Sequence, residues 1–154
     1  MTWPDLSTEQ HWWDEGATCV VGIDEVGKGS WVGPLTLAAV VLRRGASIDG
    51  LRDSKQLSAK RRAELYAERA SWSEHVGVGH ASPQECDQLG MSGAQRLAAK
   101  RALDDLGVKP DRVLVDGRWD FLRNGITTTI IKGDQSVASI AAASIVAKVV
   151  RDQL

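Results

Sequence analysis

The chain has 154 residues, of which 43% are hydrophobic and 25% are charged, and its formal net charge is −1. This composition is typical of a globular protein with one compact domain. Because the charges nearly balance, any nucleic-acid binding must rely on a local basic surface. We find no apolar run of membrane-spanning length and no secretory signal. With Cys19 and Cys86 as widely spaced free thiols, we expect a cytoplasmic protein.

The first third of the chain predicts an N-terminal arm followed by a β-hairpin. Residues 1–18 are polar with three tryptophans and form an arm or a short helix, ahead of a domain over 19–154. CVVGIDE (19–25) is a β-rich run, and GPLTLAAVVLRR (33–44) is a second one. The glycine-rich connection between them favours pairing, although it is longer than a tight turn.

The rest of the chain alternates between helical and strand patterns. Ser58 is a good N-cap for a charged amphipathic helix, and Gly107 ends the clearest helix. The order of the elements indicates a mixed α/β sheet with helices on its faces. We predict helices over 59–72, from 82 to 90, over 94–106 and over 136–154, and strands over 75–82, 112–117 and 126–134.

Three of the predicted strands end in acidic residues. These are Asp24, Asp116 and Asp134. In open α/β sheets, sites form beyond the carboxyl ends of the strands, so we expect the three carboxylates to meet at one edge. Clustered carboxylates repel one another unless a cation lies between them. Oxygen ligands of this kind fit Mg²⁺, and two such ions can act on a phosphodiester.

Simpler interpretations exist for each acid taken alone. Asp134 precedes a predicted helix and could be its N-cap. Asp116 and Gly117 could form an ordinary turn. Glu25, in a regular strand, points to the face opposite Asp24, so both reach one ion only if the strand breaks or a backbone carbonyl takes part.

GIDEVGKG, which starts at Gly22, also nearly fits a phosphate-binding loop. Gly22, Gly27 and Lys28 match that pattern, but Gly29 replaces the hydroxyl residue that binds Mg²⁺, and Ser30 comes one residue late. Two acids would also lie where backbone amides should hold phosphate. A nucleotide-binding protein is therefore the less favoured alternative.

Four segments together resemble a known family. GIDEVGKGSWVGPLTLAAVVL closely resembles the first catalytic segment of bacterial ribonuclease HII, and DSKQLSAKRR (53–62) is similar to its second motif. VLVDG (113–117) and IIKGDQSVASIAAASIVAKVVRD (130–152) are similar to the third and fourth. The segments follow the family's order, and the resemblance extends from about residue 19 to the last residue.

This resemblance implies a ribonuclease H-like fold, in which helices flank a central mixed sheet of five strands. It implies an endonuclease, dependent on Mg²⁺ or Mn²⁺, that cleaves the RNA strand of RNA/DNA hybrids. It also implies incision 5′ to a ribonucleotide embedded in duplex DNA, leaving 3′-hydroxyl and 5′-phosphate ends. We expect a monomer that binds these nucleic acids and no membrane.

The resemblance also assigns site residues. The metal-binding acids are Asp24, Glu25, Asp116 and Asp134. The family's Gly-Arg-Gly segment, which contacts the ribose 2′-hydroxyl through its backbone, matches Gly27, Lys28 and Gly29. Lys28 keeps the positive charge of that arginine but loses its planar fork. Lys55 matches a lysine placed near the phosphates.

The resemblance stops at the end of the chain. The family continues for several dozen residues beyond the Arg-Asp pair that matches Arg151 and Asp152, and that part includes a tyrosine that stacks at the RNA–DNA junction. The only tyrosine here, Tyr66, lies in a different segment. We therefore expect a chain truncated at its C-terminus. The alternative to an active enzyme is a truncated fragment that binds hybrid and cleaves weakly or not at all.

Overall fold

The structure is a computed structural model of the chain, and it describes residues 3–27, 33–52 and 54–154. In these residues, five strands form one sheet in the order β3-β2-β1-β4-β5. The strands are β1 (Val20–Val26), β2 (Leu35–Leu42), β3 (Ser73–Ala81), β4 (Arg112–Asp116) and β5 (Thr127–Ile130). Strands β1, β2 and β3 pair antiparallel, whereas β1, β4 and β5 run parallel. The predicted mixed five-stranded sheet and its N-terminal hairpin are confirmed.

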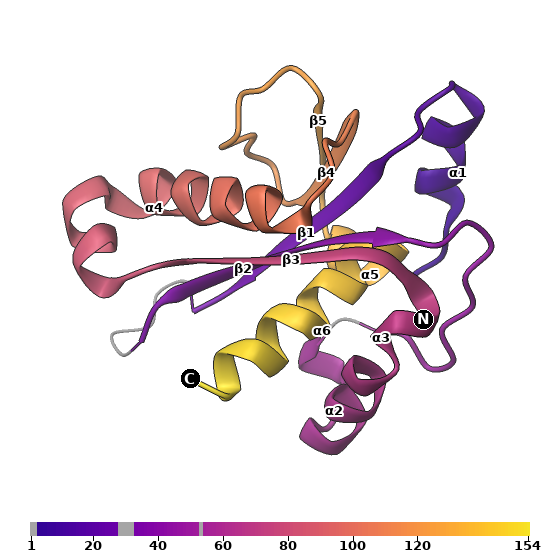
Figure 1. Cartoon of the computed structure of the whole chain (residues 1–154), viewed down its shortest axis with the longest axis horizontal. Helices are drawn as coiled ribbons and strands as arrows, with labels where there is room; N and C mark the ends of the chain where they lie inside the picture. Colours follow the sequence, from indigo (N-terminus) through magenta and orange to yellow (C-terminus); the bar gives the residue numbers. More distant parts are fainter. Residues whose placement is uncertain (1–2, 28–32, 53) are drawn as a thin grey trace.

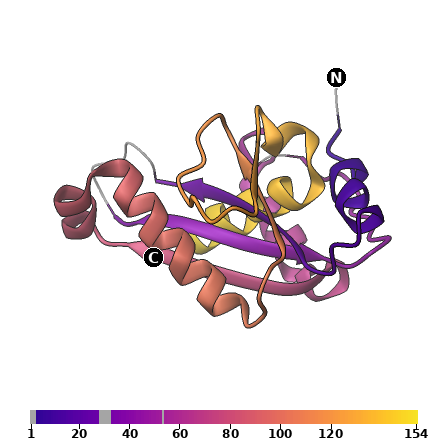
Figure 2. The ribbon, with the colours of Figure 1, turned by 90° about the horizontal axis from the view of Figure 1, so that it is seen from above.

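Helices cover both faces of the sheet (Figure 1). The helices are α1 (Ser7–Asp14), α2 (Ala59–Ala67), α3 (Arg69–Trp72), α4 (Pro83–Leu106), α5 (Gly133–Ser136) and α6 (Ala138–Asp152), with a 3₁₀ turn η1 (Ser54–Gln56). Helix α4 lies on one face, and α6 and α2 lie on the other, which the view from above also shows (Figure 2). Among the described residues, no helix is both long and apolar enough to cross a bilayer.

The side chains of β1 alternate between these two layers. Val21 and Ile23 are fully buried in the core that includes α4. Gly22 faces α6, where a Cβ would overlap the backbone of Ser139. Side chains two residues apart share a face, so Asp24 lies on the α6 side of the sheet with Gly22. The same alternation puts Leu114 of β4 in a cluster with Ile140 of α6.

Close packing of α4 on β3 depends on small residues. A Cβ at Gly77 would overlap the carbonyl oxygen of Ala102, and one at Gly79 would overlap that of Ala98. Two glycines on one face of the strand therefore let the helix backbone approach the sheet, and no larger residue fits at either position.

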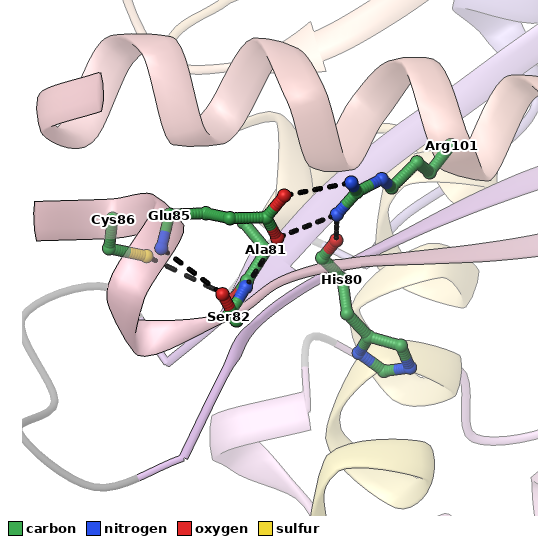
Figure 3. A network of polar contacts seen from close by, with 6 residues as sticks. All are labelled: His80, Ala81, Ser82, Glu85, Cys86 and Arg101. Carbon is green, nitrogen blue, oxygen red and sulfur yellow. Dashed lines mark hydrogen bonds and ion pairs between the residues drawn. The ribbon is translucent and has the colours of Figure 1, made fainter. Parts of the chain in front are cut away.

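The N-terminus of α4 is fixed by a polar network (Figure 3). The Ser82 hydroxyl accepts from the Glu85 amide at 3.1 Å, and the Glu85 carboxylate accepts from the Ser82 amide at 2.9 Å, forming a capping box. Arg101 donates to both Glu85 carboxylate oxygens at 2.8 Å and to the His80 carbonyl. These bonds to Arg101 and Ser82 lower the pKa of Glu85 to about 2. The predicted helix entry at residue 82 is confirmed.

Two helix predictions differ from the structure in detail. The helix expected over 59–72 starts at the predicted cap, where Ser58 accepts from the Arg61 amide, but it breaks at Glu68. The break turns the chain so that Trp72 is buried and its indole N–H donates to the Leu65 carbonyl. The two patterns at 82–90 and 94–106 form one element, α4, which is kinked at Gly90 with φ of 73°.

The strand predicted over 126–134 ends early, at Ile130. Ile130 pairs with Asp116, the last residue of β4, so no strand continues beside it. Lys132 then adopts the left-handed conformation with φ of 55°, and α5 begins at Gly133. The β-branched residues of this segment predicted the strand correctly but not the turn that ends it.

Candidate active site

Two of the predicted acids project from neighbouring parallel strands. Strands β1 and β4 pair as far as Ile23 and Val115. Asp24 and Asp116 are the next residues along each strand, so they lie side by side on the α6 face. Parallel pairing thus puts both carboxylates at the same edge of the sheet, as the sequence predicted.

Asp134 reaches this edge by a different route from the one predicted. It is neither at the end of a strand nor at an N-cap, since it lies in the first turn of α5, where Lys132 holds the N-cap position. The short helix follows the left-handed turn and carries Asp134 inward, where it is only 4% exposed. One carboxylate oxygen from each of Asp24, Asp116 and Asp134 lies within 4.8 Å of the other two. The expected meeting of three carboxylates is confirmed.

Backbone amides hold two of these carboxylates. The Gly133 amide donates to Oδ1 of Asp116 at 2.7 Å, which ties α5 directly to the end of β4. The Glu25 amide donates to Oδ1 of Asp24 at 2.9 Å. Each carboxylate keeps a second oxygen that can coordinate a cation.

The electrostatics of Asp24 fit a cation site. Burial raises the pKa of Asp24 well above its usual range, and the charges of Glu25, Asp116 and Asp134 raise it further, while the bond from the Glu25 amide partly offsets these effects. A cluster that disfavours its own ionisation is stabilised by a divalent cation. The donor set consists of carboxylate oxygens, which suits Mg²⁺ or Mn²⁺ rather than metals that prefer thiolate or imidazole.

Glu25 lies apart from this cluster. Strand β1 stays regular through Val26, so the Glu25 side chain points to the α4 face, where Oε1 accepts from Nε2 of Gln95 at 2.9 Å. The structure therefore brings together three of the four predicted acids, and the fourth carboxylate lies across the sheet edge. Glu25 still lines the same pocket as the other three, and its role as a metal ligand stays a prediction.

The pocket at this edge has a volume of about 370 Å³. Lys55, on η1, is 77% exposed, and its Nζ lies 3.4 Å from Oδ2 of Asp134. The turn that carries Lys55 is held by Ser144 of α6, whose hydroxyl accepts from the Ser54 amide at 3.1 Å, and by Arg62, which donates to the Ser54 carbonyl. The backbone of this turn thus places Lys55 beside the acids, and its contact with a phosphate stays a prediction.

Five lining residues were not among the predicted site residues, and these are Val26, Ser54, Arg62, Ser144 and Lys148. Arg62, Ser144 and Lys148 face the pocket with the acids. The i, i+4 spacing of Ser144 and Lys148 on the last helix is the sequence signal that groups them, but the same spacing describes the polar side of any packed helix. Arg62 is the last residue of the DSKQLSAKRR motif, in which the resemblance assigned only Lys55 to the site.

Gly27 also lines the pocket, at the end of β1. Its φ is 95°, and a Cβ there would lie 2.8 Å from the Pro34 carbonyl oxygen and 3.1 Å from Nε of Arg151. Arg151 donates to that same carbonyl at 2.7 Å. Only glycine fits such a position. Lys28 and Gly29, the other predicted ribose-contacting residues, lie outside the described residues.

The backbone at Gly22 argues against a nucleotide-binding loop. The residues from Gly22 to Val26 pair with β2 as a regular strand. A phosphate-binding loop needs these residues out of the sheet, with their amides turned toward the phosphates. The less favoured alternative from the sequence is therefore wrong.

The order of strands, the two helical layers and the acids at the carboxyl ends of β1 and β4 define a ribonuclease H-like fold. The ribonuclease H2 from Pyrococcus horikoshii OT3 has a matching structure, with a TM-score of 0.74 and 29% identity over 88% of this chain and 73% of that chain. The family model described as Ribonuclease HII matches residues 21–154. This chain belongs to the ribonuclease HII family.

Curated relatives agree with this assignment. The ribonuclease HII of Streptomyces avermitilis is 49% identical over 140 residues, covering 90% of this chain and 60% of that protein. The ribonuclease HII of Streptomyces griseus subsp. griseus is 51% identical over 142 residues, covering 90% of this chain and 59% of that protein. The chain therefore spans about 60% of the length of these relatives.

Proposed function

We propose that this chain is an endoribonuclease that hydrolyses the RNA strand of RNA/DNA hybrids with Mg²⁺ or Mn²⁺ as cofactor. We extend the proposal to nicking 5′ to a ribonucleotide embedded in duplex DNA, with 3′-hydroxyl and 5′-phosphate products. One observation carries it, the meeting of Asp24, Asp116 and Asp134 within 4.8 Å at the edge of a ribonuclease H-like sheet. Membership of the ribonuclease HII family supports the choice of substrate.

The three carboxylates would hold the divalent ion, and their own charge makes the site selective for cations. Divalent ions, when bound, stabilise the attacking and leaving oxygens of a phosphodiester. Asp116 is oriented for this task by the Gly133 amide, and Asp24 by the Glu25 amide. Glu25 lies at the rim of the same pocket and completes the set of acids proposed for catalysis.

Recognition of the substrate would use the basic and glycine residues around the pocket. Lys55 is exposed and lies next to Asp134, so its ammonium group can contact a phosphate close to the scissile bond. The backbone of Gly27, Lys28 and Gly29 would contact the ribose 2′-hydroxyl, the group that distinguishes RNA from DNA. Gly27 lines the same pocket as the acids, which supports contact between its backbone and a bound sugar. The monomeric state and the cytoplasmic location stay predictions from the sequence.

A nicking assay tests the proposal. The substrate is a DNA duplex with one embedded ribonucleotide, and the control is the same duplex without it. We expect Mg²⁺- or Mn²⁺-dependent incision at the 5′ side of the ribonucleotide, and we expect 3′-hydroxyl and 5′-phosphate ends that a ligase rejoins without further processing. Binding of hybrid without cleavage under all metal conditions would instead support the alternative of an inactive hybrid-binding fragment.

A further inference from the structure

A buried glutamate in the N-terminal segment contacts α6, the helix that directly follows the short helix carrying Asp134. Glu9, on α1, is only 1% exposed, and it is the one buried residue of that helix. Its Oε2 accepts from the backbone amide of Ser139 at 2.7 Å, in the first turn of α6. Burying a carboxylate is costly unless it is hydrogen-bonded, so a buried acid on a surface helix needs a specific partner. The Ser139 amide is that partner.

Helix α6 needs this contact because it has no cap of its own. Its N-cap residue is Val137, which offers no side-chain acceptor to the exposed amides of the first turn. Glu9 supplies the acceptor from a position 130 residues away in the sequence. A carboxyl group at this end of the helix also interacts favourably with the helix dipole. The N-terminal segment therefore provides the cap that the local sequence lacks.

Backbone contacts from the same segment hold the residues just before Ser139. The Ala138 amide donates to the Asp5 carbonyl at 2.9 Å, and the Asp5 amide donates to the Ser136 carbonyl at 3.2 Å. Asp5 and Val137 thus form a parallel bridge. Together with the bond from Ser139 to Glu9, these contacts fix the connection between α5 and α6.

Asp134 lies on the other side of that connection. It belongs to α5, a helix of four residues that is too short to be stable without tertiary contacts. One end of α5 is tied to the metal site by the bond from Gly133 to Asp116. The other end is held by the N-terminal segment. Ser139 also packs against Gly22, which lies two residues before Asp24 on β1. The bond between Glu9 and Ser139 therefore lies close to the strand that carries Asp24 as well as to the helix that carries Asp134.

We propose that Glu9 is a positioning residue that keeps Asp134 in the geometry required for metal binding. The inference rests on the proposed metal site, and it assigns to the N-terminal arm a role in assembling that site. Burial raises the pKa of Glu9. Its carboxyl group can accept the Ser139 amide proton whether it is ionised or neutral, so glutamine, whose side-chain carbonyl accepts the same bond, should replace it.

The test is Mn²⁺ binding in the absence of nucleic acid, measured by isothermal titration calorimetry on the full chain. Glu9→Ala should lower the Mn²⁺ affinity about 10- to 100-fold, the range typical of residues that orient metal ligands. Glu9→Gln should restore an affinity close to that of the wild type. Amide hydrogen exchange of the metal-free protein should be faster across 133–139 in Glu9→Ala than in either of the other two.

A matched control separates positioning from general destabilisation. Ser82→Ala removes the capping box of α4, on the opposite face of the sheet, and should lower the melting temperature without changing Mn²⁺ affinity. Wild-type Mn²⁺ affinity in Glu9→Ala would overturn the inference, and so would an equal loss of affinity in Ser82→Ala. If Glu9→Ala does not fold, Glu9→Asp serves instead, because its shorter side chain withdraws the acceptor from Ser139. Unchanged affinity in Glu9→Asp would then overturn the inference.

The binding assay also separates this inference from the proposed function. If the wild type binds Mn²⁺ but cleaves no hybrid, the nuclease proposal fails, and the loss of affinity in Glu9→Ala still supports the positioning role. If the wild type cleaves hybrid but Glu9→Ala binds Mn²⁺ as well as the wild type does, the positioning role fails alone.

Discussion

Asp24 and Glu25 are adjacent in the sequence, yet their carboxylates lie on opposite faces of β1. Asp24 meets Asp116 and Asp134 on the α6 side, whereas Glu25 accepts a hydrogen bond from Gln95 of α4. The two acids are therefore not equivalent in the protein without substrate. Asp24 is a direct ligand candidate, whereas the Glu25 carboxylate lies on the α4 face, outside the cluster of three acids.

This difference predicts two different effects on Mn²⁺ binding by the protein without substrate. Asp24→Asn should lower the Mn²⁺ affinity by more than roughly 10- to 100-fold, the loss that is typical when a residue outside the ligand set is changed. Glu25→Gln should leave the affinity unchanged, because the Glu25 side chain lies beside Gln95 on the α4 face, outside the cluster of three acids. Calorimetric titration of both variants checks this. An equal loss in Glu25→Gln would show that both acids bind one ion.

Asp24→Asn should also stabilise the metal-free protein. Burial and three neighbouring carboxylates disfavour the ionised form of Asp24 in the folded state, which raises its pKa. The neutral amide of asparagine avoids this cost. Thermal unfolding at neutral pH in excess chelator should therefore give a melting temperature equal to or higher than that of the wild type. A clear decrease would mean that the Asp24 carboxylate is already compensated within the protein.

The same raised pKa sets the dependence of this effect on pH. The window runs from about pH 3.9, the usual pKa of an unfolded aspartate, to the raised pKa of Asp24 in the folded protein. Within this window, the unfolded chain binds fewer protons than the folded one. The contribution of the protonated Asp24 carboxyl group to folding stability is therefore fully present below this window. It is lost as the pH rises through the window. The stability advantage of Asp24→Asn should grow with pH across the window. An advantage that shrinks with pH would contradict the assigned shift.

Gly22→Ala should destabilise the protein strongly. The added Cβ would meet the backbone of Ser139 and lie 2.6 Å from the Ile140 amide nitrogen. Because backbone atoms cannot move aside, α6 would have to shift from the sheet, at a cost of about 3 kcal/mol. Chemical denaturation measures this cost. Gly125→Ala is the comparison, since Gly125 has positive φ but open space around it, and it should cost only about 1 kcal/mol.

Lys55 should contribute to substrate binding and little to stability. Its ion pair with Asp134 is exposed on the lysine side, so it contributes at most about 1 kcal/mol to folding. Lys55→Ala should weaken hybrid binding. It should also make the affinity less dependent on salt, by the amount expected for the loss of about one phosphate contact. Lys109→Ala removes an exposed lysine from the turn between α4 and β4, at the other end of the parallel strands, and should change neither quantity. Equal effects of the two variants would show that Lys55 acts only through the net charge.

The sequence correctly predicted those site residues that lie at the ends of regular strands. Asp24 and Asp116 could be placed because each follows a buried β-branched run, and parallel strands bring their carboxyl ends together. Asp134 was predicted as a residue of the sheet edge but for the wrong reason, since ITTTIIKGD gives no sign that the strand ends when β4 runs out beside it. The position of Asp134 depends on a left-handed turn at Lys132 and on the bond from Gly133 to Asp116.

The contribution of the N-terminal arm could not be predicted at all. Glu9 lies in STEQHWWD, where a glutamate among polar residues normally faces solvent. Its burial depends on the uncapped start of α6, 130 residues away. Likewise, the helix over 59–72 showed continuous helical spacing, and its break at Glu68 follows from the burial of Trp72 against Leu65. Such long-range contacts carry no signal in local periodicity.

The most direct test of the account is cleavage of an RNA/DNA hybrid by the wild type and by Asp116→Asn, each with Mg²⁺, with Mn²⁺ and with excess chelator. Asp116 belongs to the carboxylate cluster and makes its bond to Gly133 through one oxygen, which the amide of asparagine can keep. We predict that the wild type cuts the RNA strand only with a divalent ion and that Asp116→Asn binds the hybrid but does not cut it. Cleavage at the wild-type rate by Asp116→Asn, or by the wild type in excess chelator, would contradict the account.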